Sequence, residues 1–396
     1  MKSSVVALLL IGLVAAASAE VFFREEFDNG ISHWVTSDWK DAEGATGKFE
    51  HSAGQFHKDA EEDKGLRTSE DYRFYTASAS FPEFSNKDKD LVIQYSVKHE
   101  QNLDCGGAYI KVYPAGTEQA HLNGDSKYNI MFGPDICGHS NRRVHVIFEH
   151  EGKNHLIKKT IAPETDVFSH LYTLIVSPDN TYKVLIDGVE KAAGSLAEDW
   201  DILAPKEILD PKASKPVDWV DEKDMVDPED VKPADWDDQP AEIVDPEATK
   251  PEDWDDELDG DWEAPTIANP EFKGPWAARR IPNPAYQGPW VHPKVPNPDY
   301  KDDPTLYSYE SFGVVGVEVW QVKAGTIFDN FLITDDLEEA TKYVDIVNER
   351  RAAEKAAKEV VDEAARVAAE AEAAAKKAAE TAAAEADDDE DDKDEL

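Results

Sequence analysis

The sequence predicts a mainly β protein, in which a two-sheet β-sandwich carries an inserted proline-rich hairpin arm and is followed by a C-terminal helix with an acidic tail. Apolar runs typical of strands extend from Val21 to about Leu203 and resume from Phe312 to Ile333. Between them, prolines recur every few residues, which excludes helix and central strand because proline fixes φ and lacks the N–H of a ladder. The arm is therefore an insertion, and the strands after it must return to the first sheet.

The strands of the globular part are bounded by turn residues. The run Leu171–Val176 is followed by the turn sequence Ser177–Asn180 and by Tyr182–Ile186, which predicts a hairpin. After the arm, the runs Phe312–Val322 and Ile327–Ile333 repeat the same pattern. About 200 residues of strand with few helical signals favour a two-sheet sandwich.

The arm contains two sets of three repeats. In the first set, Trp219, Trp236 and Trp254 each end a Lys-Pro-x-Asp-Trp motif, at spacings of 17 and 18 residues. The second set repeats Asn-Pro and Gly-Pro-Trp motifs with a period of 14 residues. Repeats at a fixed period indicate an array of similar units. We expect each early repeat to pair with a late one, and the chain to turn at Leu258–Asp261, which carries Asp-Gly.

A disordered linker is the alternative reading of a segment rich in proline and acidic residues. The regular spacing of tryptophan and isoleucine favours a repeated packing contact instead. At about 3.3 Å per residue, a limb of about 45 residues reaches no further than about 150 Å.

One face of two predicted strands carries aromatic and charged residues: Tyr109, Lys111 and Tyr113 in the first, and Glu318 and Trp320 in the second. An aromatic ring can cover the C–H side of a sugar, while lysine, carboxylate and tyrosine hydroxyl groups bond its hydroxyls. A solvated outer face is the other interpretation, and composition does not decide between them.

The two ends of the chain predict its compartment. Lys2, the apolar run Val5–Val14 and the small residues Ala17-Ser18-Ala19 are typical of a signal peptide. The last four residues, Lys393, Asp394, Glu395 and Leu396, form a signal for retrieval to the endoplasmic reticulum, which implies a retrieval receptor as a partner. No apolar run of about 18 residues follows the signal peptide, so we expect no membrane span and a location in the lumen.

The charge of the chain is strongly negative. The 84 acidic and 41 basic residues give a formal charge of −43, which argues against nucleic acid and favours cations or basic partners. Calcium is the expected counter-ion in this compartment. Residues 349–386 predict a solvent-exposed, alanine-rich helix, and only Asp387–Glu395 is densely acidic.

Two cysteines, Cys105 and Cys137, predict one disulfide bond in an oxidising lumen. Such a bond could stabilise the fold by roughly 3–4 kcal/mol. A zinc site is not expected from two thiols so far apart in sequence.

These signals divide the chain into five parts: a signal peptide 1–19, a first globular part 20–204, the arm 205–305, the return strands 306–339, and the C-terminal helix, acidic tail and retrieval signal 340–396.

Several motifs resemble the calreticulin family. They are the Lys-Pro-x-Asp-Trp repeats, Cys105–Lys111, Ile327–Ile333 and the terminal retrieval signal, and the resemblance covers nearly the whole chain after residue 19. It implies a legume-lectin-like (concanavalin-type) sandwich and a calcium-dependent lectin chaperone for newly made, monoglucosylated glycoproteins. The membrane-bound relative calnexin is disfavoured because no membrane span is expected.

The resemblance also implies a sugar site. The family's glucose-binding positions correspond to Tyr109, Lys111, Tyr128 and Asp135, with Met131 and Trp320 nearby. Where the family usually has aspartate, this chain has Glu318, which is one methylene longer. We expect binding to persist with altered affinity. The expected disulfide would hold the two halves of this site together.

The family's high-affinity calcium site corresponds to the carboxylate of Asp329 and to backbone carbonyls of Glu26, Glu62 and Lys64. Backbone oxygen ligands suit calcium and tolerate changes of their side chains. The tail is less acidic than in most of the family, which implies a lower storage capacity.

At the tip of the arm, the resemblance implies a site for a thiol oxidoreductase of the protein disulfide isomerase class. Its residues are Glu257, Asp259, Asp261 and Trp262. An acidic cluster around an aromatic anchor suits a basic patch on a partner. A solvated acidic turn is the alternative.

Three functions follow from these observations. We expect a monomeric lectin chaperone that is not an enzyme. The second reading is a calcium buffer and glycan-independent chaperone with a weakened sugar site. The third is a glycosidase using two carboxylates, for which no paired acidic strand motif appears.

Overall fold

The computed structural model describes residues 19–391 except 102, 139, 255–256 and 258–259. Contacts divide the chain into two compact units, of which the second is the arm, Lys206–Pro298. Within the described residues, no helix combines the length and apolar character that crossing a membrane requires.

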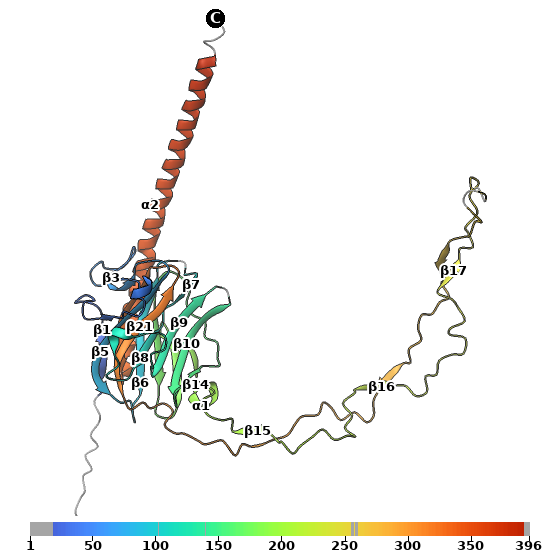
Figure 1. Cartoon of the computed structure of the whole chain (residues 1–396), viewed down its shortest axis with the longest axis horizontal. Helices are drawn as coiled ribbons and strands as arrows, with labels where there is room; N and C mark the ends of the chain where they lie inside the picture. Colours follow the sequence, from blue (N-terminus) through green and yellow to red (C-terminus); the bar gives the residue numbers. More distant parts are fainter. Residues whose placement is uncertain (1–18, 102, 139, 255–256, 258–259, 392–396) are drawn as a thin grey trace, which may run out of the picture. The chain divides into compact units, whose positions relative to one another are not determined.

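The predicted β-sandwich is confirmed, with eight strands in each sheet (Figure 1). The back sheet has the order β14-β13-β12-β6-β22-β4-β3, and β1 pairs with β22. Its strands are β1 (Val21–Glu25), β3 (Phe49–Ser52), β4 (Gly65–Thr68), β6 (Leu91–His99), β12 (Ser169–Val176), β13 (Thr181–Ile186), β14 (Val189–Ser195) and β22 (Thr326–Thr334).

The front sheet has the order β11-β10-β9-β7-β21-β5-β2, and β8 pairs with β21 and β9. Its strands are β2 (Val35–Thr36), β5 (Arg73–Phe84), β7 (Cys105–Gly107), β8 (Ile110–Tyr113), β9 (Ile130–Cys137), β10 (Asn141–His150), β11 (Lys153–Leu156) and β21 (Phe312–Gln321). Short helical turns lie at η1 (Asp41–Glu43), η2 (Gln119–His121) and α1 (Leu196–Asp199).

Aromatic residues fill the space between the sheets. Tyr95 is fully buried and lies near Phe132, Phe328 and Phe331, with ring centroids 5.8–6.4 Å apart. Each such side chain contributes roughly 1.5–3 kcal/mol on burial. The Tyr95 hydroxyl donates to the carbonyl of Ala108, at 2.6 Å, so its polar group is satisfied inside the core.

The two strands that follow the arm complete both sheets, as the sequence predicts. β21 lies between β5 and β7/β8 in the front sheet, and β22 lies between β6 and β4 in the back sheet. Because both positions are internal, residues before and after the arm must meet before either sheet is whole.

The arm pairs early repeats with late ones, as predicted. Three short antiparallel ladders bring Ile208 opposite Val295, Met225 opposite Ile281 and Ile243 opposite Ile267. Their strands are β15 (Glu207–Leu209), β16 (Asp224–Val226), β17 (Glu242–Val244), β18 (Thr266–Ala268), β19 (Arg280–Pro282) and β20 (Lys294–Pro296) (Figure 1).

A second contact repeats along the arm. The indole N–H groups of Trp219, Trp236 and Trp254 donate to the carbonyls of Gly288, Gly274 and Gly260, at 2.7–2.8 Å. All three glycines have φ between 72° and 87°, a region that disfavours other residues. The third glycine belongs to Gly260-Asp261-Trp262, which takes the place of a Gly-Pro-Trp motif.

The last helix, α2 (Leu337–Asp391), begins on the back sheet. The backbone N–H groups of Glu338 and Glu339 donate to Asp336 Oδ1, which caps the helix. Its apolar residues Ala340, Tyr343 and Val347 are buried against the back-sheet residues Val92, Leu171 and Leu332.

The expectation that residues 349–386 are solvent-exposed is wrong at its start. Arg350 is 7% exposed and Glu354 is 1% exposed. Glu354 accepts from the backbone N–H and hydroxyl of Ser169, at 2.8 and 2.6 Å, and lies 3.5 Å from Lys98 Nζ. The reason is a set of charge pairs with the back sheet that composition does not reveal. Every residue from Glu359 to Ala379 is exposed.

We predict that ending the chain after Asp336 destabilises the sandwich strongly, whereas ending it after Lys358 does not. The first truncation exposes the apolar patch and removes Arg350 from buried Asp329 and Glu354 from buried Lys98, and losing one partner of a buried pair costs about 3–5 kcal/mol. Denaturant unfolding of both truncated chains measures the difference. Equal stability of the two would contradict the assignment of α2 to the globular fold.

A second prediction concerns His170, which lies between Asp187 and Asp166, with nitrogen–oxygen distances of 2.7 and 2.8 Å. Arg351 of α2 pairs with the same Asp187. Burial lowers the pKa of His170, but the hydrogen bonds and charges of the two aspartates outweigh burial and raise it.

A raised folded-state pKa gives stability that is complete below the ordinary histidine value of about 6.5 and is lost as pH rises through the folded value. We therefore expect the free energy of unfolding to fall as pH rises above about 6.5. Unfolding titrations of the chain and of His170→Gln check this result. An unchanged pH dependence in the variant would show that another group is responsible.

Candidate functional site

The front sheet brings the predicted sugar-binding residues onto one face. Its register places Lys111 opposite Gly316 on one side and opposite Met131 on the other. Since side chains alternate along each strand, Glu318 and Asp135 lie further along the same face. The prediction that these residues share a face is therefore consistent with the register.

Lys111 and Glu318 form an ion pair in the middle of this face. They are only 4% and 7% exposed, so most of their hydration is lost. The Lys111 ammonium also lies over the ring of Tyr128, 4.9 Å from its centroid. The longer side chain of Glu318 thus still reaches the lysine, and the pair presents a donor and an acceptor beside an aromatic ring.

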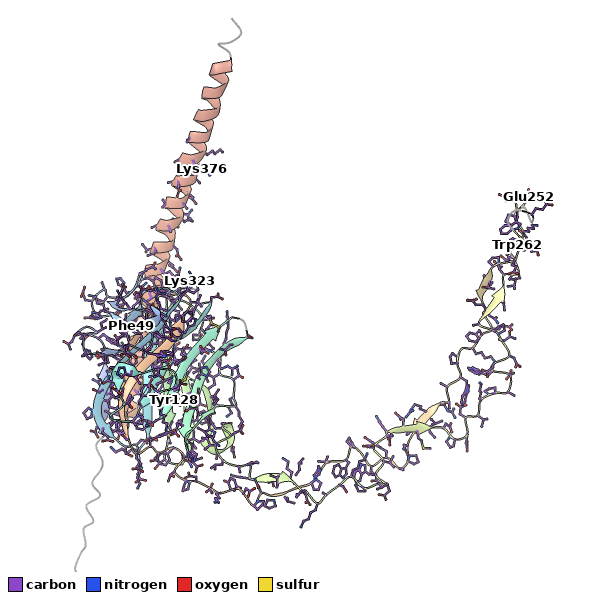
Figure 2. All side chains as sticks on the ribbon, in the orientation of Figure 1. Phe49, Tyr128, Glu252, Trp262, Lys323 and Lys376 are labelled. Carbon is purple, nitrogen blue, oxygen red and sulfur yellow. A yellow bond between two sulfur atoms is a disulfide. The ribbon has the colours of Figure 1, made fainter. Side chains whose placement is uncertain are left out.

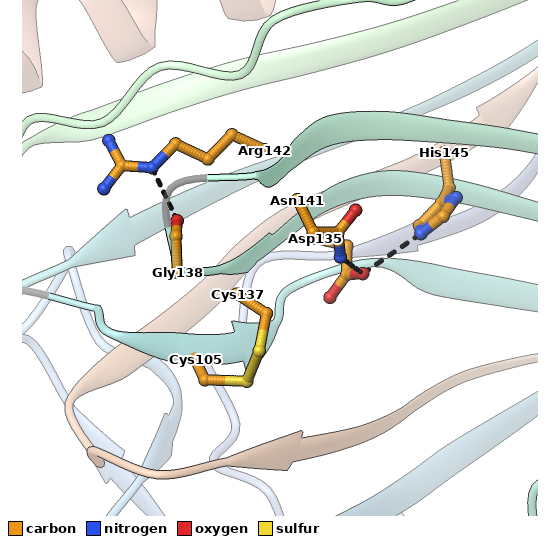
Figure 3. The surroundings of a disulfide bond; sticks show 7 residues. All are labelled: Cys105, Asp135, Cys137, Gly138, Asn141, Arg142 and His145. Carbon is orange, nitrogen blue, oxygen red and sulfur yellow. Dashed lines mark hydrogen bonds and ion pairs between the residues drawn. A yellow bond between two sulfur atoms is a disulfide. The ribbon is translucent and has the colours of Figure 1, made fainter.

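Asp135 is held in its charged form by two neighbours of β10. Its Oδ2 accepts from Asn141 Nδ2 at 2.8 Å and lies 3.2 Å from His145 Nε2 (Figure 3). Burial raises the pKa of Asp135, but the hydrogen bonds from His145 and Asn141 lower it more, so the net shift is downward. The carboxylate is therefore an acceptor at neutral pH.

The disulfide bond between Cys105 and Cys137 is confirmed and joins the directly paired residues of β7 and β9 (Figure 3). Asp135 lies two residues before Cys137, and Tyr109 lies four residues after Cys105. The bond therefore links the two chain segments that supply these site residues.

Three tyrosines add neutral hydroxyl groups. Burial, with the charge of Glu318, raises the pKa of Tyr128 to about 12 and also raises the pKa values of Tyr109 and Tyr113. All three are donors at neutral pH. The Tyr109 ring lies where a side chain at Gly107 would stand, since a Cβ there would come within 2.5 Å of the ring. The Tyr113 hydroxyl is buried and finds no hydrogen-bond partner among the residues that the structure describes.

An aromatic group borders the site. Trp320 is half-buried and lies 4.6 Å from Phe74, ring centroid to centroid, and Phe74 lies 5.2 Å from Trp39. Phe74 is directly opposite Trp320 in the ladder of β5 and β21. Sequence reasoning missed Phe74, Trp39, Asn141 and His145, because only the strand register identifies them as neighbours.

Two of the four residues that the family resemblance assigns to calcium line one acidic cavity. Glu26 and Glu62 line one cavity, together with Asp28 and Asp63. Lys64 is not among the lining residues, and its ammonium pairs with Glu61 at 2.6 Å.

The carboxylate of Asp329 is already engaged. Its Oδ1 accepts from the backbone N–H of Asn330 at 2.7 Å, and its Oδ2 accepts from Arg350 Nη1 at 2.5 Å. Burial raises the pKa of Asp329 to about 7, against the opposing effect of Arg350. Among the described residues, no group of three His, Cys, Asp or Glu side chains is placed to hold a metal ion. Arg350 thus occupies Oδ2 of Asp329, and the assignment of Glu26, Glu62, Lys64 and Asp329 to calcium stays a prediction.

At the tip of the arm, Asp261 and Glu257 are exposed and Trp262 is half-buried. Figure 2 labels Trp262 near the end of the arm. Asp259 lies outside the described residues, as do residues 1–18 of the expected signal peptide and the expected retrieval signal, Lys393–Leu396.

The fold defines a class of lectin-like β-sandwich with an inserted proline-rich arm. The calreticulin family model matches residues 22–260 and 258–333. Calreticulin of Dictyostelium discoideum is 58% identical over 329 residues, which cover 83% of this chain and 77% of that protein. Calreticulin of Macaca fuscata fuscata is 60% identical over 354 residues, which cover 88% and 83%.

Among solved structures, the T. cruzi calreticulin globular domain matches with a TM-score of 0.63 and 34% identity. The match covers 87% of this chain and 99% of that one. The chain belongs to the calreticulin family.

We predict that Lys111→Met lowers the free energy of unfolding by about 3–5 kcal/mol, because it leaves Glu318 buried and unpaired. The double variant Lys111→Met/Glu318→Leu should recover most of that loss, since apolar side chains of similar volume replace the pair. Guanidinium unfolding of the three chains measures both effects. Full stability of the single variant would contradict a buried, mutually dependent pair.

Proposed function

We propose that this chain is a lectin chaperone of the endoplasmic reticulum lumen that binds monoglucosylated high-mannose N-glycans on newly made glycoproteins. The observation that carries the proposal is the buried Lys111–Glu318 pair beside Tyr128, on the face that also holds Asp135. Sugar recognition needs paired donors and acceptors, because hydroxyls left unpaired on either side cost affinity. Family membership supports the same conclusion.

The binding groups include Tyr109, Met131 and Trp320, which supply apolar area for the C–H side of a sugar ring. Tyr109 and Tyr128 add hydroxyl donors. The pKa of Asp135 is lowered, so this carboxyl group is ionised at neutral pH. A glycosidase acid needs a raised pKa, so Asp135 suits an acceptor of sugar hydroxyls.

The arm serves in this proposal to recruit a thiol oxidoreductase of the protein disulfide isomerase family. Support comes from the acidic and aromatic tip, Glu257, Asp261 and Trp262, whose charge would steer a basic partner. The formal charge of −43 supports a contribution to calcium homeostasis through weakly held ions. The retrieval signal at the end of the chain supports the lumenal location.

The test compares Asp135→Asn with a matched change away from the site. Asp135→Asn keeps the shape of the side chain but removes the charge, and we expect it to lose most affinity for a monoglucosylated mannose oligosaccharide. The control is Asp179→Asn, in the turn between β12 and β13 of the back sheet, which should bind normally. Calorimetric titration measures both, with circular dichroism to confirm folding. Unchanged affinity in Asp135→Asn would remove Asp135 from the site.

A further inference from the structure

The buried surroundings of Asp329 contain a positive charge that belongs to the chain itself. Besides Asp329, the Arg350 guanidinium contacts Asn330 Oδ1 at 3.2 Å and Asp63 Oδ1 at 3.0 Å. Arg350 and Asp63 are each 7% exposed, and Asp329 is 2% exposed. Arg350 therefore pairs with two buried carboxylates at once.

Helix α2 also reaches the acidic cavity beside this pair. Glu26, which lines the cavity, accepts a hydrogen bond from the Tyr343 hydroxyl of α2. Lys58, on the same cavity, pairs with Glu349 of α2 at 2.9 Å. Residues of α2 that span about two turns thus engage the residues that surround the cavity.

Arginine and calcium are alternatives for the same oxygen. Calcium needs six to eight oxygen ligands, whereas a guanidinium offers only donors and cannot join such a shell. Both oxygens of Asp329 are engaged, Oδ1 by a backbone N–H and Oδ2 by Arg350. A divalent cation at Oδ2 would therefore lie directly against the Arg350 guanidinium, and the two positive charges would repel each other.

We propose that the Arg350 guanidinium is the counter-ion of Asp329. It occupies the position at Asp329 that the family resemblance assigns to calcium. The docking of this part of α2 and the binding of calcium to Asp329 then exclude each other. This inference adds to the proposed function a way for calcium to act on the C-terminal helix, and it depends on the assignment of Asp329.

Two consequences can be measured. With Arg350 in place, the fold needs no calcium at Asp329, so its unfolding temperature should change little when calcium is chelated. Without Arg350, Asp329 and Asp63 lose their shared counter-charge, and the variant should depend on calcium for stability.

The experiment uses the full chain and Arg350→Gln, each studied by calorimetric calcium titration and by thermal unfolding in chelator and in millimolar calcium. We expect Arg350→Gln to unfold at a lower temperature in chelator, to recover in calcium and to bind calcium about tenfold more tightly, a typical size for coupled sites. The matched control is Arg366→Gln, on the exposed part of α2, where Arg366 pairs only locally with Glu363 and Glu370. It should behave as the unchanged chain.

The variant Arg350→Lys keeps a positive charge on a shorter side chain. It is the second test if Arg350→Gln does not fold. Its gain in calcium affinity should lie between those of the other two chains. The proposal is overturned if neither variant binds calcium more tightly than the unchanged chain.

The variant Asp329→Asn distinguishes two failures: that Arg350 does not compete with calcium, and that Asp329 does not bind calcium. If Asp329→Asn weakens calcium binding while the Arg350 variants change nothing, calcium binds Asp329 beside Arg350, and only the competition is wrong. If the calcium affinity gained in Arg350→Gln persists in Arg350→Gln/Asp329→Asn, the ion binds elsewhere, and the assignment of Asp329 is wrong.

Discussion

The structure depends on the return of the chain after the arm. β21 and β22 occupy internal positions of the two sheets, so neither sheet is complete until residues separated by the whole arm have paired. The same two strands carry candidate site residues: Glu318 and Trp320 on β21, and Asp329 on β22. Folding of the sandwich and assembly of the site are consequently one event, and contacts of such high sequence separation are slow to form.

The arm shows how a segment without a core can keep a defined pairing. Each ladder has only three residues per strand, which is too short to be stable alone. The tryptophan N–H bonds to Gly260, Gly274 and Gly288 add a second contact between each pair of repeats. Regular spacing in sequence was enough to predict this pairing, because repeats of equal geometry must meet in reverse order around one turn.

The features predicted from the sequence are those that local patterns indicate. The buried charges that were missed depend on contacts between residues far apart in the chain. Alternation along β8 and β21 placed Lys111 and Glu318 on one face, and two cysteines indicated one disulfide. No local pattern marked Arg350 and Glu354 as buried, because their partners Asp329 and Ser169 lie on distant strands. The calcium residues illustrate the same limit, since a family resemblance transfers positions but not the arginine that now contacts Asp329.

In the proposed function, the front-sheet site recognises a glucosylated glycan with Glu318 in place of the family's aspartate. The most direct measurement is calorimetric titration of the unchanged chain with a monoglucosylated mannose oligosaccharide and with the same oligosaccharide lacking glucose. We expect binding of the glucosylated glycan alone. Binding of neither by the folded protein, or equal binding of both, would contradict it.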